Sequence, residues 1–202
     1  MDLFDIYSKV WRAAADDAYV VYRGIGNSGG EAGWFDPRFD EETGRANPEV
    51  VVFRPYARPY PQPSPDRNDG TRLTPLELEA ELFILAHEAG HLRSFKTGGE
   101  KWRAYFAAAL ARDKIVAGVD REPPTDFAMR SRAATSAGLS TEQKNLIVEE
   151  EQLAWELGKE LLRSAGMQDF VKYDESTRLG VHFHRYRLGM DELWPSDRSE
   201  SN

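Results

Sequence analysis

Apolar residues recur every three or four positions in several separate stretches of this chain, which is the spacing of one face of an α-helix. In the stretch that begins at Pro75, this apolar face includes Leu78, Leu82, Leu85 and Ala89. The same spacing predicts further helices, of which the one over 126–137 has the weakest pattern. Together the predicted helices cover about residues 2–18, 75–95, 101–114, 126–137 and 140–165.

Short polar patterns predict where two of these helices begin. Thr74 and Glu77 form a capping box around Pro75, and proline suits the first helical position because it has no N–H that needs a partner. Ser140 and Gln143 have the same capping-box spacing ahead of the last predicted helix. These two helix starts are therefore encoded locally.

Other segments favour β-structure. Residues 18–23 and 49–56 are rich in Val and Tyr, and the second of them is the strongest strand candidate. Residues 178–188 are compatible with either a strand or a helix, and a strand would point His182 and His184 to the same side. These elements predict an α+β fold in which a small antiparallel or mixed sheet packs on a helical core.

Segments rich in glycine and proline separate the predicted elements. Gly24–Gly29 matches G-x-G-x-x-G, but Asp36 and Pro37 oppose the following helix that a dinucleotide site needs, so a loop is favoured. Residues 54–65 contain five prolines and predict an extended connector beside the active cleft, with an interaction motif as the alternative. Residues 68–70 predict a turn.

Length and composition narrow the class of protein. A chain of 202 residues fits a single domain over residues 1–202, and its net charge of −8 argues against direct nucleic-acid binding, which needs a basic face. The chain has no cysteine, which leaves histidines and carboxylates as the strong zinc ligands. Residues 1–5 have no basic signal-peptide region, and no apolar run is long enough to span a bilayer. We therefore expect a cytoplasmic protein without a membrane partner.

His87, Glu88 and His91 form the pattern His-Glu-x-x-His within the helix predicted from Pro75. Residues i and i+4 of a helix lie on one face, one turn apart, so the two imidazoles are placed to bind one Zn²⁺. Glu88 is then within reach of a zinc-bound water as a general base. The alternative is a pair of partly exposed helix histidines that flank an ordinary Glu. Gly90 lowers helix stability by about 1 kcal/mol relative to Ala. Either the small residue lets a neighbouring helix or a substrate approach closely, or the glycine is simply tolerated.

A catalytic zinc usually has three protein ligands and one open position, so a third ligand is needed. The helix predicted at 140–165 offers Glu149, Glu150 and Glu151. Glu151 shares a face with small and apolar residues, where an unpaired carboxylate would be costly, so Glu151 is the first choice. Glu150 is the second choice, and Glu149 is expected to face solvent. The alternative is a solvated acidic run without a ligand role.

One segment of the chain resembles a known family. The segment Glu151-x-x-Ala154-Trp155-x-Leu157-Gly158-x-x-Leu161-Leu162 resembles the E-x-x-A-N-x-F-A-x-x-L-L segment of the ImmA/IrrE-type metallopeptidases, which are gluzincins. The order of a hairpin-like region at 34–37, a strand at 50–53, the motif helix and the Glu helix also fits that family. The resemblance covers about residues 20–165 and leaves residues 166–202 as a C-terminal extension. It implies a zincin-like fold in which the two metal-bearing helices are adjacent.

The resemblance also implies roles for individual residues. Two positions depart from the family pattern, because Trp155 stands where Asn is usual and Gly158 stands where Ala is usual. These departures bear on the substrate and the pathway more than on the metal site. By the resemblance, the zinc ligands are His87, His91 and Glu151, and the catalytic base is Glu88.

The predicted activity is zinc-dependent hydrolysis of a peptide bond by a regulatory or specialised intracellular endopeptidase. A bound Zn²⁺ lowers the pKa of water from about 15.7 toward 7 and polarises the scissile carbonyl, while Glu88 takes the proton and passes it to the leaving amine. The developing oxyanion needs a further donor, for which His182 is our choice. The other residues considered for this role are His184, Arg185 and Tyr186.

Two other functions are compatible with the sequence. The first alternative is a zinc-binding regulatory or interaction protein on a zincin scaffold without proteolytic activity. The second is zinc-dependent hydrolysis of a small amide or ester. If the substrate is a protein or peptide, the strand at 50–53 either pairs with it by edge addition or is an ordinary strand of the sheet.

Overall fold

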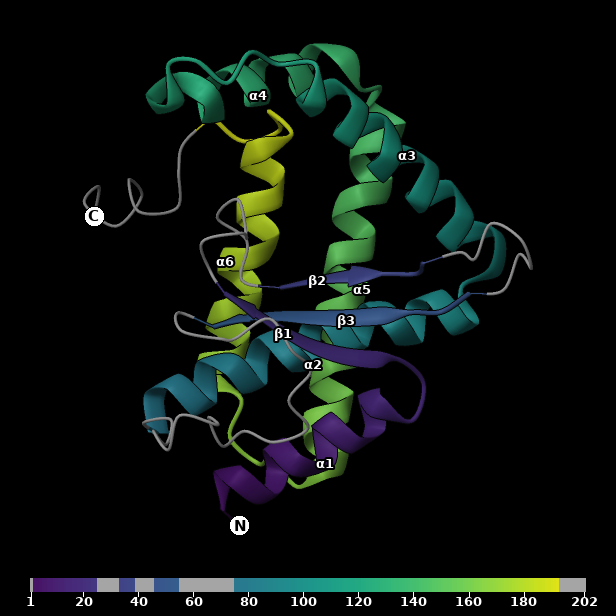
Figure 1. Ribbon diagram of the computed structural model, residues 1–202, viewed down its shortest axis with the longest axis vertical. Helices are drawn as coiled ribbons and strands as arrows, with labels where there is room; N and C mark the ends of the chain where they lie inside the picture. The colour runs from purple at the N-terminus through teal and green to yellow at the C-terminus, as the bar shows by residue number, and fades with distance from the viewer. Residues whose placement is uncertain (1, 25–32, 39–45, 55–74, 193–202) are drawn as a thin grey trace. The chain divides into compact units, whose positions relative to one another are not determined.

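The computed structural model describes residues 2–24, 33–38, 46–54 and 75–192 (Figure 1). Contacts divide the chain into two compact units. Unit 1 consists of Met1–Thr97 with Leu153–Tyr173, and unit 2 consists of Gly98–Gln152 with Asp174–Asn202. Two helices, α5 (Thr141–Ala165) and α6 (Val171–Arg187), contribute residues to both units.

Unit 1 contains a small mixed sheet and the helices that cover it. Its elements follow the order α1, β1, β2, β3 and α2 along the chain. The sheet order is β1-β3-β2, with β1 parallel and β2 antiparallel to β3. The sheet is therefore mixed, which the sequence left open against a purely antiparallel sheet. The bounds are Leu3–Ala15 for α1, Tyr19–Gly24 for β1, Gly33–Asp36 for β2, Glu49–Arg54 for β3 and Pro75–Thr97 for α2.

The strongest predicted strand, β3, is the central strand of the sheet. Val51 pairs with Val21 of β1 on one side and with Trp34 of β2 on the other. Val50 and Val52 are fully buried together with Val51, as expected for a strand that is covered on both faces. Strand β3 cannot accept a substrate strand, because β1 is paired with one of its edges and β2 with the other. The hypothesis of edge addition at residues 50–53 is therefore wrong, and the alternative of an ordinary sheet strand is confirmed.

Helix α2 is the core helix of unit 1, as its apolar spacing predicted. It packs against α1, β2 and β3, and its residues Leu82, Leu85 and Ala86 are fully buried. These positions belong to the apolar stripe that the sequence identified from Pro75 onward. The histidine motif on α2 is thereby carried into the interior of unit 1.

A buried set of hydrogen bonds joins the beginning of α2 to α1 and β1. The hydroxyl of Tyr7 lies 2.6 Å from the hydroxyl of Tyr22 and donates to Oε1 of Glu81 at 2.5 Å. Both tyrosines are fully buried, and Glu81 is nearly so. Buried polar groups need such partners, so these contacts fix the three elements relative to one another.

Helix α2 crosses the unit 1 part of α5 at two glycines. A Cβ atom at Gly90 would lie 1.9 Å from the carbonyl oxygen of Ala154, and one at Gly158 would lie 2.6 Å from the carbonyl oxygen of Ala86. Non-bonded carbon atoms in contact lie about 3.5 Å or more apart, so neither position has space for a side chain. Of the alternatives for Gly90, the close approach of a neighbouring helix is confirmed.

Unit 2 is helical in its described part. It contains α3 (Gly99–Ala117), α4 (Pro124–Gly138), the first half of α5 and most of α6. The capping box of α5 forms as predicted, with Ser140 N donating to Gln143 Oε1 and Gln143 N donating to Ser140 Oγ. The apolar core of this unit consists of Ala108, Leu139, Ile147, Val148 and Leu188.

The choice between strand and helix for residues 178–188 is resolved in favour of a helix, since α6 extends to Arg187. Six helices and one three-stranded mixed sheet lie within the described ranges, in agreement with the predicted α+β class. None of the described helices has both the length and the apolar character needed to cross a membrane.

Several sequence predictions fall outside the described residues. These are the glycine loop after Gly24, the prolines within 55–65, the turn at 68–70, the cap at Thr74 and the polar C-terminus from Pro195. Nothing in the structure bears on these predictions.

We expect Gly90→Ala to lower the free energy of unfolding by about 2 kcal/mol, because the added methyl group must push α5 away from α2. This loss exceeds the gain of about 1 kcal/mol in helix propensity. Chemical denaturation followed by circular dichroism measures the change. Gly118→Ala is the matched control, since its Cβ would meet the nearest atom at 3.5 Å and the expected change is within about 0.5 kcal/mol. Equal stability of both variants would contradict the close crossing.

Candidate metal centre

One face of α2 brings together the three residues of the His-Glu-x-x-His motif. His87, Glu88 and His91 are 8%, 5% and 5% exposed, so the alternative of partly exposed helix histidines is wrong. The ring centroids of the two histidines lie 4.7 Å apart with an interplanar angle of 72°. One ligand atom from each of the three residues lies within 4.8 Å of the others.

This group offers donor atoms of the kinds that bind a metal ion such as zinc. Zn²⁺ binds imidazole nitrogen at about 2.0–2.1 Å, so two nitrogen ligands of one tetrahedral ion lie roughly 3.4 Å apart. The ligand atoms of His87, Glu88 and His91 lie within 4.8 Å of one another, so they would have to move closer together to bind one ion. The two imidazoles fit as ligands, and Glu88 lies between them in sequence as an additional carboxylate.

The carboxylate of Glu88 lies against the backbone of strand β2. A Cβ atom at Gly33 would lie 2.9 Å from Oε1 of Glu88 and 2.7 Å from Cγ2 of Ile84. The missing side chain at Gly33 thus lets β2 pass close to this carboxylate. No sequence pattern identified Gly33 as a neighbour of Glu88, because the composition of a single strand contains no signal for this contact.

The imidazole of His87 is stacked on an aromatic side chain from α5. The ring centroids of His87 and Trp155 lie 4.3 Å apart with an interplanar angle of 25°. Trp155 is 8% exposed, so the indole covers this imidazole inside unit 1. The sequence identified Trp155 only as a departure from a family pattern, since stacking between two helices has no local sequence signal.

The acidic run on α5 divides in the way that its helical spacing predicted. Glu149 is exposed and lies 3.5 Å from Nζ of Lys101, whereas Glu150 and Glu151 are buried. The alternative of a fully solvated acidic run is therefore wrong. The choice of Glu151 over Glu150 as the third ligand stays a prediction, because both belong to unit 2 and the histidines of the motif belong to unit 1.

Two residues of unit 2, His184 and Arg112, interact with the carboxylate of Glu151. Nε2 of His184 lies 3.4 Å from Oε2 of Glu151. Burial lowers the pKa of Arg112, but attraction to neighbouring groups, with Asp113 foremost and Glu151 among them, outweighs burial and raises that pKa above its ordinary value. Glu151 and Arg112 therefore attract one another within unit 2.

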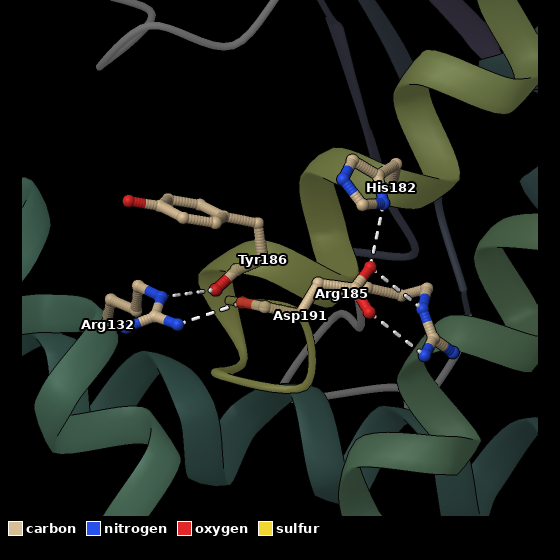
Figure 2. A network of polar contacts seen from close by, with 5 residues as sticks. All are labelled: Arg132, His182, Arg185, Tyr186 and Asp191. Carbon is tan, nitrogen blue, oxygen red and sulfur yellow. Dashed lines mark hydrogen bonds and ion pairs between the residues drawn. The ribbon is translucent and has the colours of Figure 1, made fainter. Parts of the chain in front are cut away.

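His182, the predicted oxyanion donor, belongs to a polar network at the end of α6 (Figure 2). Its Nδ1 lies 2.7 Å from Oδ2 of Asp191, and Nε of Arg185 lies 3.1 Å from the same oxygen. Arg132 of α4 donates to the backbone carbonyls of Asp191 and Tyr186. The network orients His182 and anchors the chain that follows α6, and the oxyanion role of His182 stays a prediction.

The side chains of His182 and His184 do not point to the same side, as they would on a strand, because the segment is a helix. Residues two apart on a helix point about 200° away from each other. His182 accordingly meets Asp191, whereas His184 meets Glu151. Sequence reasoning missed Asp191, since its contact forms only where the chain reverses at Gly189, which has φ of 69°.

Comparisons with known proteins do not assign the chain to a family. No model of a known protein family matches it, and neither a curated protein nor a solved structure matches it. The likeness to ImmA/IrrE-type metallopeptidases therefore rests on the motif residues of this chain alone. The function is accordingly argued from the geometry of the group around His87.

Proposed function

We propose that this protein is a zinc-dependent hydrolase that cleaves peptide bonds. The observation that carries the proposal is the buried group of His87, Glu88 and His91, whose ligand atoms lie within 4.8 Å of one another. Two imidazoles with an adjacent carboxylate on one helix form the arrangement that metallopeptidases use. The mixed sheet packed on α2 supports a zincin-like scaffold as part of the same proposal.

In this proposal each residue has one task. His87 and His91 hold the zinc, with Glu151 of the Glu helix as the expected third ligand and Glu150 as the second choice. Zinc supplies Lewis acidity, which activates water and polarises the scissile carbonyl. Glu88 accepts a proton from the attacking water and delivers it to the leaving amine. His182 remains the proposed donor to the developing oxyanion.

The position of β2 suggests how an extended peptide reaches the site. Among the described residues, the strand partner of β2 is β3, and the other edge of β2 has no strand partner in those ranges. An extended peptide adds to such an edge through main-chain hydrogen bonds. Because Gly33 of β2 abuts the carboxylate of Glu88, a peptide on this edge would run past the proposed base.

The burial of the whole group favours a second candidate function. A closed zinc site is typical of structural zinc, whereas a catalytic zinc keeps an accessible position for water. His87, Glu88 and His91 are each less than 9% exposed. A regulatory zinc-binding protein without proteolytic activity has this property, and the role of Glu88 separates the two functions.

The metal assignment predicts about one zinc per chain in protein purified without added metal. We expect His91→Ala and Glu151→Gln to lose the zinc, because each removes a ligand. Glu150→Gln is the matched control, since it changes a neighbouring buried carboxylate and should keep the zinc. Elemental analysis of the folded variants provides the measurement. A wild-type protein that takes up no zinc when zinc is offered would refute the proposal.

We expect Glu88→Gln to keep the zinc but to lower the rate of peptide hydrolysis roughly 10²- to 10⁴-fold, because the amide cannot accept the proton. The measurement is cleavage of a peptide library by mass spectrometry, normalised to zinc content. Full activity in this variant would remove Glu88 from the mechanism. Absence of cleavage in the zinc-loaded wild type would instead favour the regulatory function.

We expect Gly33→Ala to lower kcat roughly tenfold or more with an unchanged zinc content, since the new methyl group would press on the carboxylate of Glu88 as well as on Ile84 and the carbonyl oxygen of Val51. Steady-state kinetics on a peptide identified from the library would measure this effect. Gly118→Ala serves as the control, since it is a glycine substitution within unit 2 whose Cβ meets the nearest atom at 3.5 Å. An unchanged kcat in Gly33→Ala would show that the contact with Glu88 has no catalytic consequence.

A further inference from the structure

Four aromatic rings form a closed set in unit 1, and one of them is the imidazole of His87. Beyond the stack of His87 on Trp155, the ring of Tyr173 meets Trp155 edge-on, with centroids 5.2 Å apart and an angle of 65°. Tyr173 also meets Phe83 edge-on at 5.2 Å and 86°. Phe83 lies one turn before His87 on α2, which completes the set. We call Phe83, His87, Trp155 and Tyr173 the aromatic box.

The indole of Trp155 is held in place by more than its ring contacts. The hydroxyl of Tyr173 donates to the backbone carbonyl of Trp155 at 2.9 Å, inside the fully buried environment of Tyr173. Trp155 therefore has its backbone and one side of its ring fixed by Tyr173. The indole also stacks on the imidazole of His87, which restricts the plane of that imidazole in turn.

The two departures from the family pattern are parts of this one arrangement. Trp155 occupies a position where the resembled segment has Asn, whose amide has no ring to stack on an imidazole. At Gly158, where that segment has Ala, a Cβ atom would lie 2.5 Å from the hydroxyl of Tyr173. Gly158 thus leaves the space for the hydroxyl that holds Trp155. Gly158 and Trp155 are therefore physically coupled through Tyr173.

An indole face favours an imidazole that is bound to a metal. The face of the indole ring carries negative electrostatic potential, and an imidazole that donates its lone pair to Zn²⁺ becomes electron-poor. Stacking of such rings contributes to stability beyond the burial of their surface. The fixed ring plane also reduces the side-chain entropy that metal binding would otherwise remove.

We propose that Trp155 is a positioning residue for the metal centre, which holds the imidazole of His87 in its ligand orientation and strengthens zinc binding. This inference rests on the proposed function, because it assumes that His87 is a zinc ligand. Trp155 itself contacts neither the metal nor the substrate in this role. If Trp155 only packed in the core, its substitution would lower the free energy of unfolding but would leave the affinity for the metal unchanged. A measurement of metal affinity therefore separates the two roles.

The decisive experiment is a zinc competition titration against a chromophoric chelator. We expect Trp155→Met, which keeps an apolar side chain but removes the ring, to bind zinc roughly three- to tenfold more weakly than the wild type. Trp155→Phe keeps a ring and should bind zinc within about twofold of the wild type. The matched control is Trp102→Met, because Trp102 is a buried tryptophan of unit 2 that stacks on Phe106 rather than on a histidine.

A cobalt(II) titration gives a second measurement, which does not depend on the stability of Trp155→Met. Cobalt bound at His87 should quench the fluorescence of Trp155, and this quenching should disappear in Trp155→Phe. Equal zinc affinity in Trp155→Met and the wild type would overturn this inference while leaving the proposed function intact. Quenching that persists unchanged in Trp155→Phe would also overturn it. A wild-type protein that binds neither metal would refute the proposed function and this inference together.

Discussion

Where α2 crosses α5, the backbones approach so closely that Gly90 and Gly158 leave no space for a Cβ atom. A helix normally loses about 1 kcal/mol for each internal glycine relative to Ala, so this approach has an intrinsic cost. The close crossing also determines which side chains meet. Because Gly90 lies within the His-Glu-x-x-His motif, the crossing point is at the motif itself, and the next residue of α5 after Ala154 stacks on His87.

Burial of the motif raises a second physical problem. Imidazoles and a carboxylate lose hydration inside a protein, and this loss must be offset by hydrogen bonds, ion pairs or a metal. At the beginning of α2 this cost is offset by a hydrogen bond, since the buried carboxylate of Glu81 accepts from the hydroxyl of Tyr7. The group around His87 has the donor set of a zinc site, so a bound metal would offset the same cost there.

The two candidate functions assign different roles to the carboxylate of Glu88. A structural zinc has no use for a carboxylate beside its histidine ligands, whereas a hydrolytic zinc needs a group that moves a proton. Strand β2 lies against this carboxylate at Gly33, which places an edge suited to an extended peptide beside it. This contact favours hydrolysis over a purely structural role. The aromatic box serves either function, because it acts on the metal ligand and not on the substrate.

Local physics explains what could be predicted from the sequence. Helical spacing placed His87 and His91 on one face, and the Ser140–Gln143 box marked the start of α5. Helical spacing along α5 also separated the exposed Glu149 from the buried Glu151. Each of these inferences depends on residues within a few positions of one another, where the geometry of a helix is fixed. The α+β class followed from the same local patterns.

Contacts between distant segments were decided by the tertiary structure. The central position of β3 depends on which strands pair with it, and its valines fit a central or an edge strand equally well. The helical state of residues 178–188 and the contact between His182 and Asp191 arise from the packing of α6 and the chain reversal after it. The stack of Trp155 on His87 needs α2 and α5 at one separation, which Gly90 and Gly158 permit but no local pattern encodes. The sequence by itself determined the chemistry available on each helix, and the tertiary structure determined which of those groups meet, because only packing brings remote segments within contact distance.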